Sequence, residues 1–102
     1  MSDHKIWLSS PHMGGYERDY INDAFDSNWI APFGANITGF EHDLEKYLSH
    51  DSFVTALNSA TAAIHLGLIL LDVKPGDVVI CQSLTFSASA NPILYQGATP
   101  VF

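Results

Sequence analysis

The sequence predicts an α/β fold in which helices cover both faces of a largely parallel sheet. Short apolar segments at 53–57, 78–81 and 100–102 have the length of strands, and two helical stretches, at about 59–72 and 85–96, separate them. This alternation is typical of parallel sheets, whose crossover helices lie on the faces of the sheet. The first of the two helical stretches is apolar nearly all round, which indicates a helix buried on more than one side.

The amino-terminal part is predicted to contain an irregular arm and two amphipathic helices. Pro11 is one of the residues that exclude a helix over 1–14. Apolar residues then recur at helical spacing within 16–27 and again within about 36–48. Both stretches carry polar residues on the opposite face, so each is expected to bury one stripe.

The segment between these two helices, "NWIAPFG", interrupts the helical pattern. It is too apolar for a free linker, because it contains Trp29, Ile30 and Phe33. We expect it to pack on the body of the protein, on a substrate or on a second subunit.

Prolines mark the turns of the carboxyl-terminal part. Pro75-Gly76 is a turn signal before the second predicted strand. Pro92 falls inside the 85–96 stretch, where it would remove a backbone hydrogen bond and clash with the preceding turn. We therefore expect a kink or a later helix start at that point.

Composition and charge narrow the possible functions. The chain has 102 residues, 47% of them apolar and 15% charged, which is the profile of a folded domain. Four Lys and Arg against eleven Asp and Glu give a net charge of −7, which argues against a general binder of nucleic acid or anionic membranes. The sequence shows neither a secretory signal nor an apolar run of membrane length, so the predicted location is cytoplasmic.

The cysteine and histidine patterns predict neither a disulfide nor a metal site. Cys81 is the single cysteine and lies in an apolar strand, where a structural thiol is expected. The five histidines are scattered, with no pair at metal-binding spacing. His65 lies on the apolar helix, where a hydrogen-bonded core histidine is more common than a catalyst.

A small turn with two hydroxyl groups, "NSATAA", lies where the first strand gives way to a helix. Ligands of open α/β sheets bind at the carboxyl ends of strands, where helix N-termini offer free N–H groups. Ser59 or Thr61 can donate a hydroxyl to a phosphate there, and Ala60 and Ala62 let the backbone come close. The alternative is that Ser59 caps the helix and Thr61 has no ligand. The pattern alone leaves both interpretations open.

A second candidate feature, "SLTFSAS", follows the next predicted strand. The ring of Phe86 would lie at the same edge of the sheet as the small turn, where it can stack on a planar heterocycle. Together the two features suit a phosphorylated aromatic cofactor. The alternative is an ordinary helix start, with Thr85 as its cap and Phe86 in the core.

Three stretches, in this order, resemble the amino-terminal part of the DegT/DnrJ/EryC1/StrS family of pyridoxal-phosphate-dependent sugar aminotransferases. They are "LSSPHMGGYERDYINDAF", "NWIAPFGANITGFEHDLEKYL" and "ALNSATAAIHLGLILLDVKPGDVVICQSLTFSASANPILYQGATPVF". The third is highly specific, because its small-residue turn, its Pro-Gly-Asp hairpin and its Thr-Phe strand end keep the family's spacing. The resemblance covers nearly the whole chain from Ile6 onward.

The resemblance implies the amino-terminal part of a fold type I transferase large domain, a three-layer α/β/α structure whose sheet would be incomplete here. It implies an arm and amphipathic helix over 1–35 and the start of the large, cofactor-binding domain over 36–102. It also implies that the strand at 53–57 lies apart from the next two strands, because later strands of the family fill the space between them.

The resemblance also implies pyridoxal 5′-phosphate as the cofactor and assigns its contacts. Thr61 and Ala62 would hold the phosphate through a hydroxyl and a backbone N–H, with Ser59 and Ala60 shaping the turn. Phe86 would stack on the pyridine ring. Ala60 stands where the family more often has glycine, and its methyl group slightly narrows the backbone options without excluding the site.

The catalytic groups of the family are not expected in this chain, so we predict no catalytic residue here. Transamination needs a lysine that forms a Schiff base with the cofactor and an acidic partner for the pyridinium nitrogen. In the family both come well beyond the last residue of this sequence. None of Lys5, Lys46 and Lys74 matches the family's lysine.

The leading hypothesis is therefore the amino-terminal portion of a homodimeric aminotransferase that moves an amino group, from glutamate, onto a nucleotide-linked keto-sugar. Amino-sugar or polysaccharide biosynthesis is the implied setting. The regions 11–13 and 29–34 resemble the part of the family that lines the nucleotide-sugar pocket and the dimer contact. The alternatives are a non-catalytic α/β module that binds a small phosphorylated ligand, and an interaction domain without a ligand.

Overall fold

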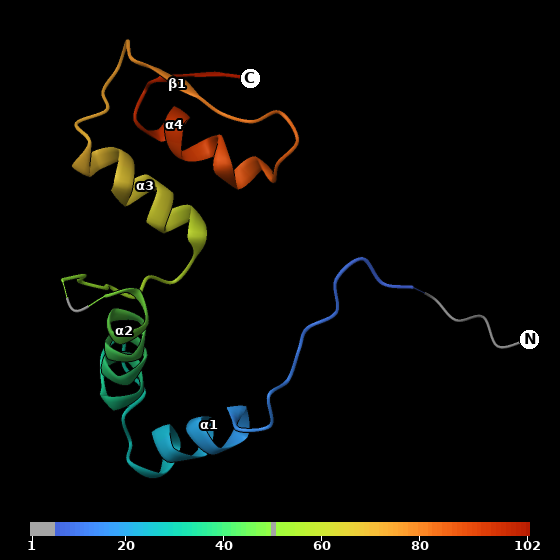
Figure 1. Cartoon of the computed structure of the whole chain (residues 1–102), viewed down its shortest axis with the longest axis vertical. Helices are drawn as coiled ribbons and strands as arrows, with labels where there is room; N and C mark the ends of the chain where they lie inside the picture. The colour runs from blue at the N-terminus through green and yellow to red at the C-terminus, as the bar shows by residue number, and fades with distance from the viewer. Residues whose placement is uncertain (1–5, 50) are drawn as a thin grey trace, which may run out of the picture. The chain divides into compact units, whose positions relative to one another are not determined.

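The computed structural model describes residues 6–49 and 51–102, and Figure 1 labels their helices and the first strand. Contacts divide the chain into two compact units, Met1–Val54 and Thr55–Phe102, which are described in turn. The predicted domain boundary between residues 35 and 36 stays a prediction. Within the described residues, no helix combines the length and the apolar character needed to cross a membrane.

The amino-terminal unit contains both predicted helices, α1 (Glu17–Asp26) and α2 (Ala35–Leu48), but the expectation that each buries an apolar stripe is wrong, because neither helix has a buried residue. Residues 6–14 form neither helix nor strand, as predicted for the arm, whose first five residues lie outside the described part. After α1 the chain turns at Asn28, which has a positive φ of 53°. Asparagine tolerates this left-handed conformation better than most residues, so the break falls at the start of "NWIAPFG".

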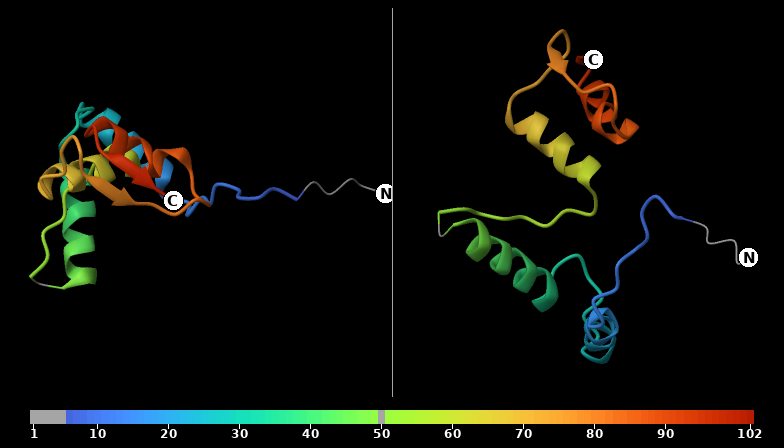
Figure 2. Two further views of the ribbon diagram at one scale, coloured as in Figure 1. Left: turned by 90° about the horizontal axis from the view of Figure 1, so that it is seen from above. Right: turned by 45° about the vertical axis from the view of Figure 1, so that its right-hand side comes forward.

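The carboxyl-terminal unit is a helix followed by a β–α–β crossover. Its elements, in chain order, are α3 (Ala60–Leu70), β1 (Val78–Ile80), the 3-10 helix η1 (Ser87–Ser89), α4 (Asn91–Tyr95) and β2 (Thr99–Val101). The two strands are parallel, with Val79 opposite Pro100, and the left view of Figure 2 shows them side by side. A parallel pair joined through a helix is the unit from which α/β sheets are built.

A small apolar core holds this unit together. Leu68 of α3, Ile93 of α4 and Ala98 before β2 are buried, and Val73, Val79 and Cys81 pack against them. Cys81 is half-buried in this cluster, as expected of a structural thiol. The core thus joins α3, α4 and the sheet.

Pro92 determines where α4 begins. The predicted helix over 85–96 is wrong as a continuous element, because the structure has a 3-10 turn and then a helix of only five residues. Pro92 lies in the first turn of that helix, where its missing N–H costs no intrahelical hydrogen bond. The expected later start at this proline is confirmed.

The predicted strand at 53–57 does not form. Its residues alternate between exposed and half-buried positions, as in a strand, but they pair with no other strand in the described part of the chain. A strand needs hydrogen bonds to a neighbour, and β1 and β2 take each other as partners instead. The expectation that the first strand lies apart from the next two stays a prediction.

The prediction of a buried strand is wrong for one face of β1. Val78 and Ile80 are 63% and 87% exposed, whereas Val79 packs against the core. Successive side chains of a strand point to opposite faces of the sheet. The helices of this unit therefore cover one face, and no described element of this unit covers the other.

Candidate functional site

The predicted phosphate turn lies at the start of α3. Ser59 is the N-cap residue, with an extended backbone, and its Oγ accepts a hydrogen bond from the Ala62 N–H at 3.2 Å. This geometry confirms the capping interpretation of Ser59. It also means that the Ala62 N–H, which was expected to face a phosphate, already has an acceptor inside the protein.

Two other backbone donors remain at this end of the helix. The N–H groups of Ala60 and Thr61 have no acceptor within the residues that the structure describes, and the same holds for the Thr61 hydroxyl. They lie at the positive end of the helix dipole, beside the small side chains of Ser59 and Ala62. Free N–H groups, a hydroxyl and close access to the backbone form a donor set that fits a phosphate.

The face of α3 that carries Thr61 packs against the crossover. Thr61, His65 and Leu68 lie at spacings of four and three residues, and so share one side of the helix. Leu68 is buried and the other two are half-buried. Because α3 contacts both η1 and α4, this stripe faces those two elements, with Thr61 at its amino-terminal end.

Phe86 directly precedes η1, and its side chain is 79% exposed. The interpretation that placed this ring in the core is therefore wrong, and a ring face is free to stack. The hydroxyls of Thr85 and Ser89 pair with each other at 2.9 Å, so Thr85 does not cap a backbone N–H. In Figure 1 and in the right view of Figure 2, α3 and the η1–α4 segment begin on the same side of the unit.

His65 is held by side chains at the end of α4. The Gln96 amide Nε2 lies 2.6 Å from His65 Nε2, so the amide N–H donates to an unprotonated ring nitrogen. The rings of His65 and Tyr95 meet edge to face, with centroids 5.4 Å apart. These contacts confirm that His65 is a hydrogen-bonded packing histidine.

A second candidate region lies within the amino-terminal unit, at "NWIAPFG". Trp29 Nε1 donates to the Phe33 carbonyl at 2.7 Å, and the two rings meet edge to face. Gly34 makes this possible, because a Cβ atom there would lie 2.0 Å from Trp29 Cδ1. The segment therefore packs on itself and borders an apolar groove of about 540 Å³ near the end of α1, which is also lined by Ala24, Ile30 and Ile37.

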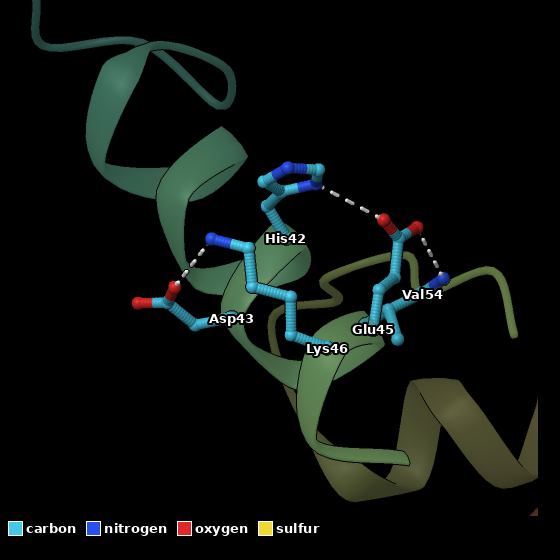
Figure 3. A network of polar contacts seen from close by, with 5 residues as sticks. All are labelled: His42, Asp43, Glu45, Lys46 and Val54. Carbon is cyan, nitrogen blue, oxygen red and sulfur yellow. Dashed lines mark hydrogen bonds and ion pairs between the residues drawn. The ribbon is translucent and has the colours of Figure 1, made fainter. Parts of the chain in front are cut away.

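A polar network ties the end of α2 to the segment that leads toward α3 (Figure 3). The Val54 N–H donates to Glu45 Oε1 at 3.0 Å, and His42 Nδ1 lies 3.3 Å from Glu45 Oε2. The hydrogen bond from Val54, followed by that from His42, lowers the pKa of Glu45. On the same helix Lys46 and Asp43 form an exposed pair at 3.8 Å.

The chain resembles known proteins over nearly its whole length. Residues 11–102 match the DegT/DnrJ/EryC1/StrS aminotransferase family. The chain belongs to this family. EpsN of Bacillus subtilis, named as a pyridoxal phosphate-dependent aminotransferase, is 56% identical over 98 residues, which cover 96% of this chain and 25% of EpsN. The GDP-perosamine synthase of Caulobacter vibrioides is 42% identical over 97 residues, covering 95% of this chain and 26% of the synthase.

Solved structures of family members confirm the predicted fold class. Spr1654 of Streptococcus pneumoniae, named as a sugar aminotransferase, is 38% identical with a TM-score of 0.81, and the match covers 94% of this chain and 24% of Spr1654. Its structure has been solved in forms with pyridoxal phosphate and with the aminated cofactor, PMP. The expected cofactor is thus the one found in a solved relative. The chain spans about a quarter of the length of these relatives.

Neither described lysine has the surroundings typical of a reactive amine. Lys46 and Lys74 each pair with a nearby aspartate on the surface, at 3.8 and 3.2 Å, and both side chains are more than half exposed. An amine that attacks a carbonyl at neutral pH is normally desolvated or placed beside another cation. Lys5 lies outside the described residues. The prediction of no catalytic residue stays a prediction.

One contact of this region was not predicted from the sequence, and the consequence of another was not foreseen. Gln96 bonds to His65 across 31 residues, and no local periodicity connects two such positions. Capping by Ser59 was predicted as an alternative. That it occupies the Ala62 N–H and leaves the N–H groups of Ala60 and Thr61 as the free donors was not predicted. The three-residue spacing of a side-chain cap was the signal that could have shown it.

Proposed function

We propose that this sequence supplies the phosphate-binding turn and the stacking ring of a pyridoxal-phosphate-dependent aminotransferase that acts on a nucleotide-linked keto-sugar. The supporting observation is the start of α3, where the N–H groups of Ala60 and Thr61 and the Thr61 hydroxyl have no acceptor in the described chain. The first N–H groups of a helix have no intrahelical acceptor, and an anionic group at this exposed to half-buried helix end satisfies them directly.

Each site residue then has a definite task. Ala60 and Thr61 donate to the phosphate oxygens, and Ser59 holds the first helical turn in place by accepting from Ala62. Phe86 covers one face of the pyridine ring and excludes water from it. When bound, pyridoxal phosphate supplies the electron sink that amino transfer requires. The reactive lysine and the acidic partner of the ring nitrogen would come from the remainder of the enzyme.

Names of relatives support the substrate class. One relative is a GDP-perosamine synthase and another, from Saccharopolyspora spinosa, is a dTDP-4-dehydro-2,3,6-trideoxy-D-glucose 4-aminotransferase that is 43% identical over 98 residues. Both names refer to sugars or amino sugars that are linked to a nucleotide. The same proposal includes glutamate as the amino donor, a homodimer and a cytoplasmic location. It also assigns the regions 11–13 and 29–34 to sugar binding or dimer contact.

A hybrid enzyme tests this proposal. The chain replaces the matching quarter of EpsN, and the purified hybrid is assayed for bound pyridoxal phosphate by absorbance and for amino transfer from glutamate to nucleotide-linked keto-sugars. We expect stoichiometric cofactor and measurable transfer. A hybrid that folds, as judged by circular dichroism and gel filtration, but takes up no cofactor would contradict the proposal.

Two variants of the hybrid test the assigned contacts. Thr61→Ala removes the hydroxyl and Phe86→Ala removes the ring, and each should weaken cofactor binding about tenfold, as expected for one charge-assisted hydrogen bond or one stacked ring. Leu84→Ala is the matched control, because this neighbouring side chain is 93% exposed. Equal affinities in all three variants would exclude the assignment.

A direct experiment separates binding from chemistry. The 102-residue chain is mixed with pyridoxal phosphate and then with borohydride, which fixes any lysine bonded to the cofactor. We expect no stoichiometric labelling of a single lysine, since none of the three matches the family's reactive position. Specific labelling of one lysine would show that this chain carries the reactive amine itself.

A further inference from the structure

We propose that His65 is a positioning residue that fixes the phosphate turn relative to the stacking ring. This inference rests on the proposed function, because it concerns the two parts of the cofactor site. Thr61 belongs to α3, whereas Phe86 belongs to the loop that leads into α4. Their spacing therefore depends on how α3 and α4 are fastened together.

His65 is rigidly connected to the phosphate turn. It lies one turn after Thr61 on the same face of α3, about 6 Å along the helix axis. The turn between them is regular, capped by Ser59 and closed by the hydrogen bond from the Ala63 N–H to the Ser59 carbonyl at 3.1 Å. A displacement of His65 is therefore passed on to Thr61.

The other partners of His65 are rigidly connected to Phe86. Tyr95 ends α4 and Gln96 is its C-cap residue, and this helix is joined to Phe86 by consecutive tight turns. The Ser89 N–H donates to the Phe86 carbonyl at 2.9 Å, and the Ala90 N–H donates to the Ser87 carbonyl at 3.0 Å. The segment from Phe86 to Gln96 can thus move as one body.

The bond between these two bodies is directional. Leu68 and Ile93 also join α3 to α4, but apolar contacts allow one helix to slide along the other. The hydrogen bond from Gln96 to His65 is 2.6 Å long, and no other side-chain hydrogen bond links α3 to α4 within the described residues. Because such bonds weaken steeply with misalignment, this one selects a single register of the two helices.

The hybrid holoenzyme tests the inference with readouts other than activity. His65→Ala is expected to raise the Kd for pyridoxal phosphate about tenfold, the effect of losing one hydrogen bond and leaving the Gln96 amide unpaired. The circular dichroism that the protein induces in the bound cofactor should weaken, because it reports how the ring is held. Exchanging the partners, His65→Gln with Gln96→His, should restore both signals.

A second variant keeps the test decisive if the exchanged pair does not fold. His65→Phe retains a ring against Tyr95 but removes the acceptor, so it should bind the cofactor as weakly as His65→Ala. If either folded variant has a lower thermal midpoint but an unchanged Kd and unchanged cofactor dichroism, His65 is merely structural and the inference is wrong.

Failure of the inference and failure of the proposed function give different results. If the unmodified hybrid binds no pyridoxal phosphate, the proposed function itself fails. If the unmodified hybrid binds it, Thr61→Ala weakens binding and the His65 variants do not, only the positioning role of His65 is lost.

Discussion

The carboxylate of Glu45 accepts the backbone N–H of Val54 at 3.0 Å and so fastens the last turn of α2 to the chain beyond it. The two residues are nine positions apart, and the hydrogen bond closes the loop of chain between them. Val54 is half-buried and donates no bond to a neighbouring strand. In this structure a side chain therefore takes the place that a strand partner would occupy.

The Glu45–Val54 bond is expected to break in acid. Hydrogen bonds from Val54 and His42 favour the carboxylate, so the pKa of Glu45 lies below its ordinary value of 4.5 in the folded chain. The stabilising contribution is therefore present above pH 4.5 and is lost as the pH falls through the lowered folded value. An NMR titration should show the Val54 amide signal moving with a midpoint below 4.5.

Variants identify the group that moves this signal. Glu45→Gln should abolish the acid transition of the Val54 amide. Asp43→Asn is the matched control, because Asp43 pairs with Lys46 on the surface of the same helix, and it should leave the transition in place. A midpoint at or above 4.5 in the unmodified chain would show that the bond does not favour the carboxylate.

Gly34 is expected to be irreplaceable at the start of α2. Its φ of 148° lies in a region that other residues avoid, and an added Cβ would overlap the Trp29 ring. Gly34→Ala should cost about 1–3 kcal/mol of local stability and release Trp29 from Phe33. In a Trp7→Phe background, tryptophan fluorescence should shift to longer wavelength.

Gly39 provides the control for this substitution. It lies inside α2 with open space around its Cα, so Gly39→Ala should stabilise the helix by about 0.5–1 kcal/mol. Its fluorescence should match that of the background protein. The argument from the Trp29 ring is wrong if Gly34→Ala and Gly39→Ala behave alike.

The sequence predicted most elements because periodicity and turn residues are local signals. α1 and α2 came from helical spacing, the turn before β1 from Pro75-Gly76, and the late start of α4 from Pro92. The prediction of a strand at 53–57 was wrong because a strand also needs a neighbour to pair with, which a local pattern does not reveal. Its apolar alternation is present, but no strand within the described residues pairs with it.

The candidate site was predictable in position but not in detail. Ser59, Thr61 and Phe86 could be singled out because small hydroxyl residues and a ring follow consecutive predicted strands. Whether Ser59 caps the helix and leaves Thr61 as a free donor depends on the rotamer of Ser59, which residue types alone do not determine. The His65–Gln96 bond depends on the packing of α3 against the end of α4, which is a tertiary property.

Ile93 is expected to be essential for the carboxyl-terminal unit. Its side chain is 2% exposed and lies between α3 and the sheet, so Ile93→Ala should destabilise the unit by about 2–5 kcal/mol. The neighbouring Leu94 is 57% exposed, and Leu94→Ala should change stability by about 0.5 kcal/mol or less.

Hydrogen exchange measures this difference at the sheet. The Cys81 N–H donates to the Val101 carbonyl at 2.8 Å and the Thr99 N–H to the Asp77 carbonyl at 2.9 Å, so both amides should be protected. Protection should fall steeply in Ile93→Ala and persist in Leu94→Ala. Rapid exchange of both amides in the unmodified chain would contradict the β1–β2 pairing.

Ser59 and Thr61 are expected to affect different properties, although they lie two residues apart. Ser59→Ala removes the cap on the Ala62 N–H and should cost about 1 kcal/mol of stability. Thr61→Ala places a better helix former in the first turn and leaves the cap intact, so the stability of the protein should be equal or slightly higher.

The binding of pyridoxal phosphate should respond in the opposite order. Only Thr61→Ala removes a hydroxyl that has no partner within the described chain, so it should weaken binding more than Ser59→Ala does at temperatures where both variants are folded. Thermal unfolding and cofactor titration of the two hybrid variants make this comparison. If both variants lose stability and affinity in the same proportion, the hydroxyl of Thr61 has no separate role, and the start of α3 serves only to begin a helix.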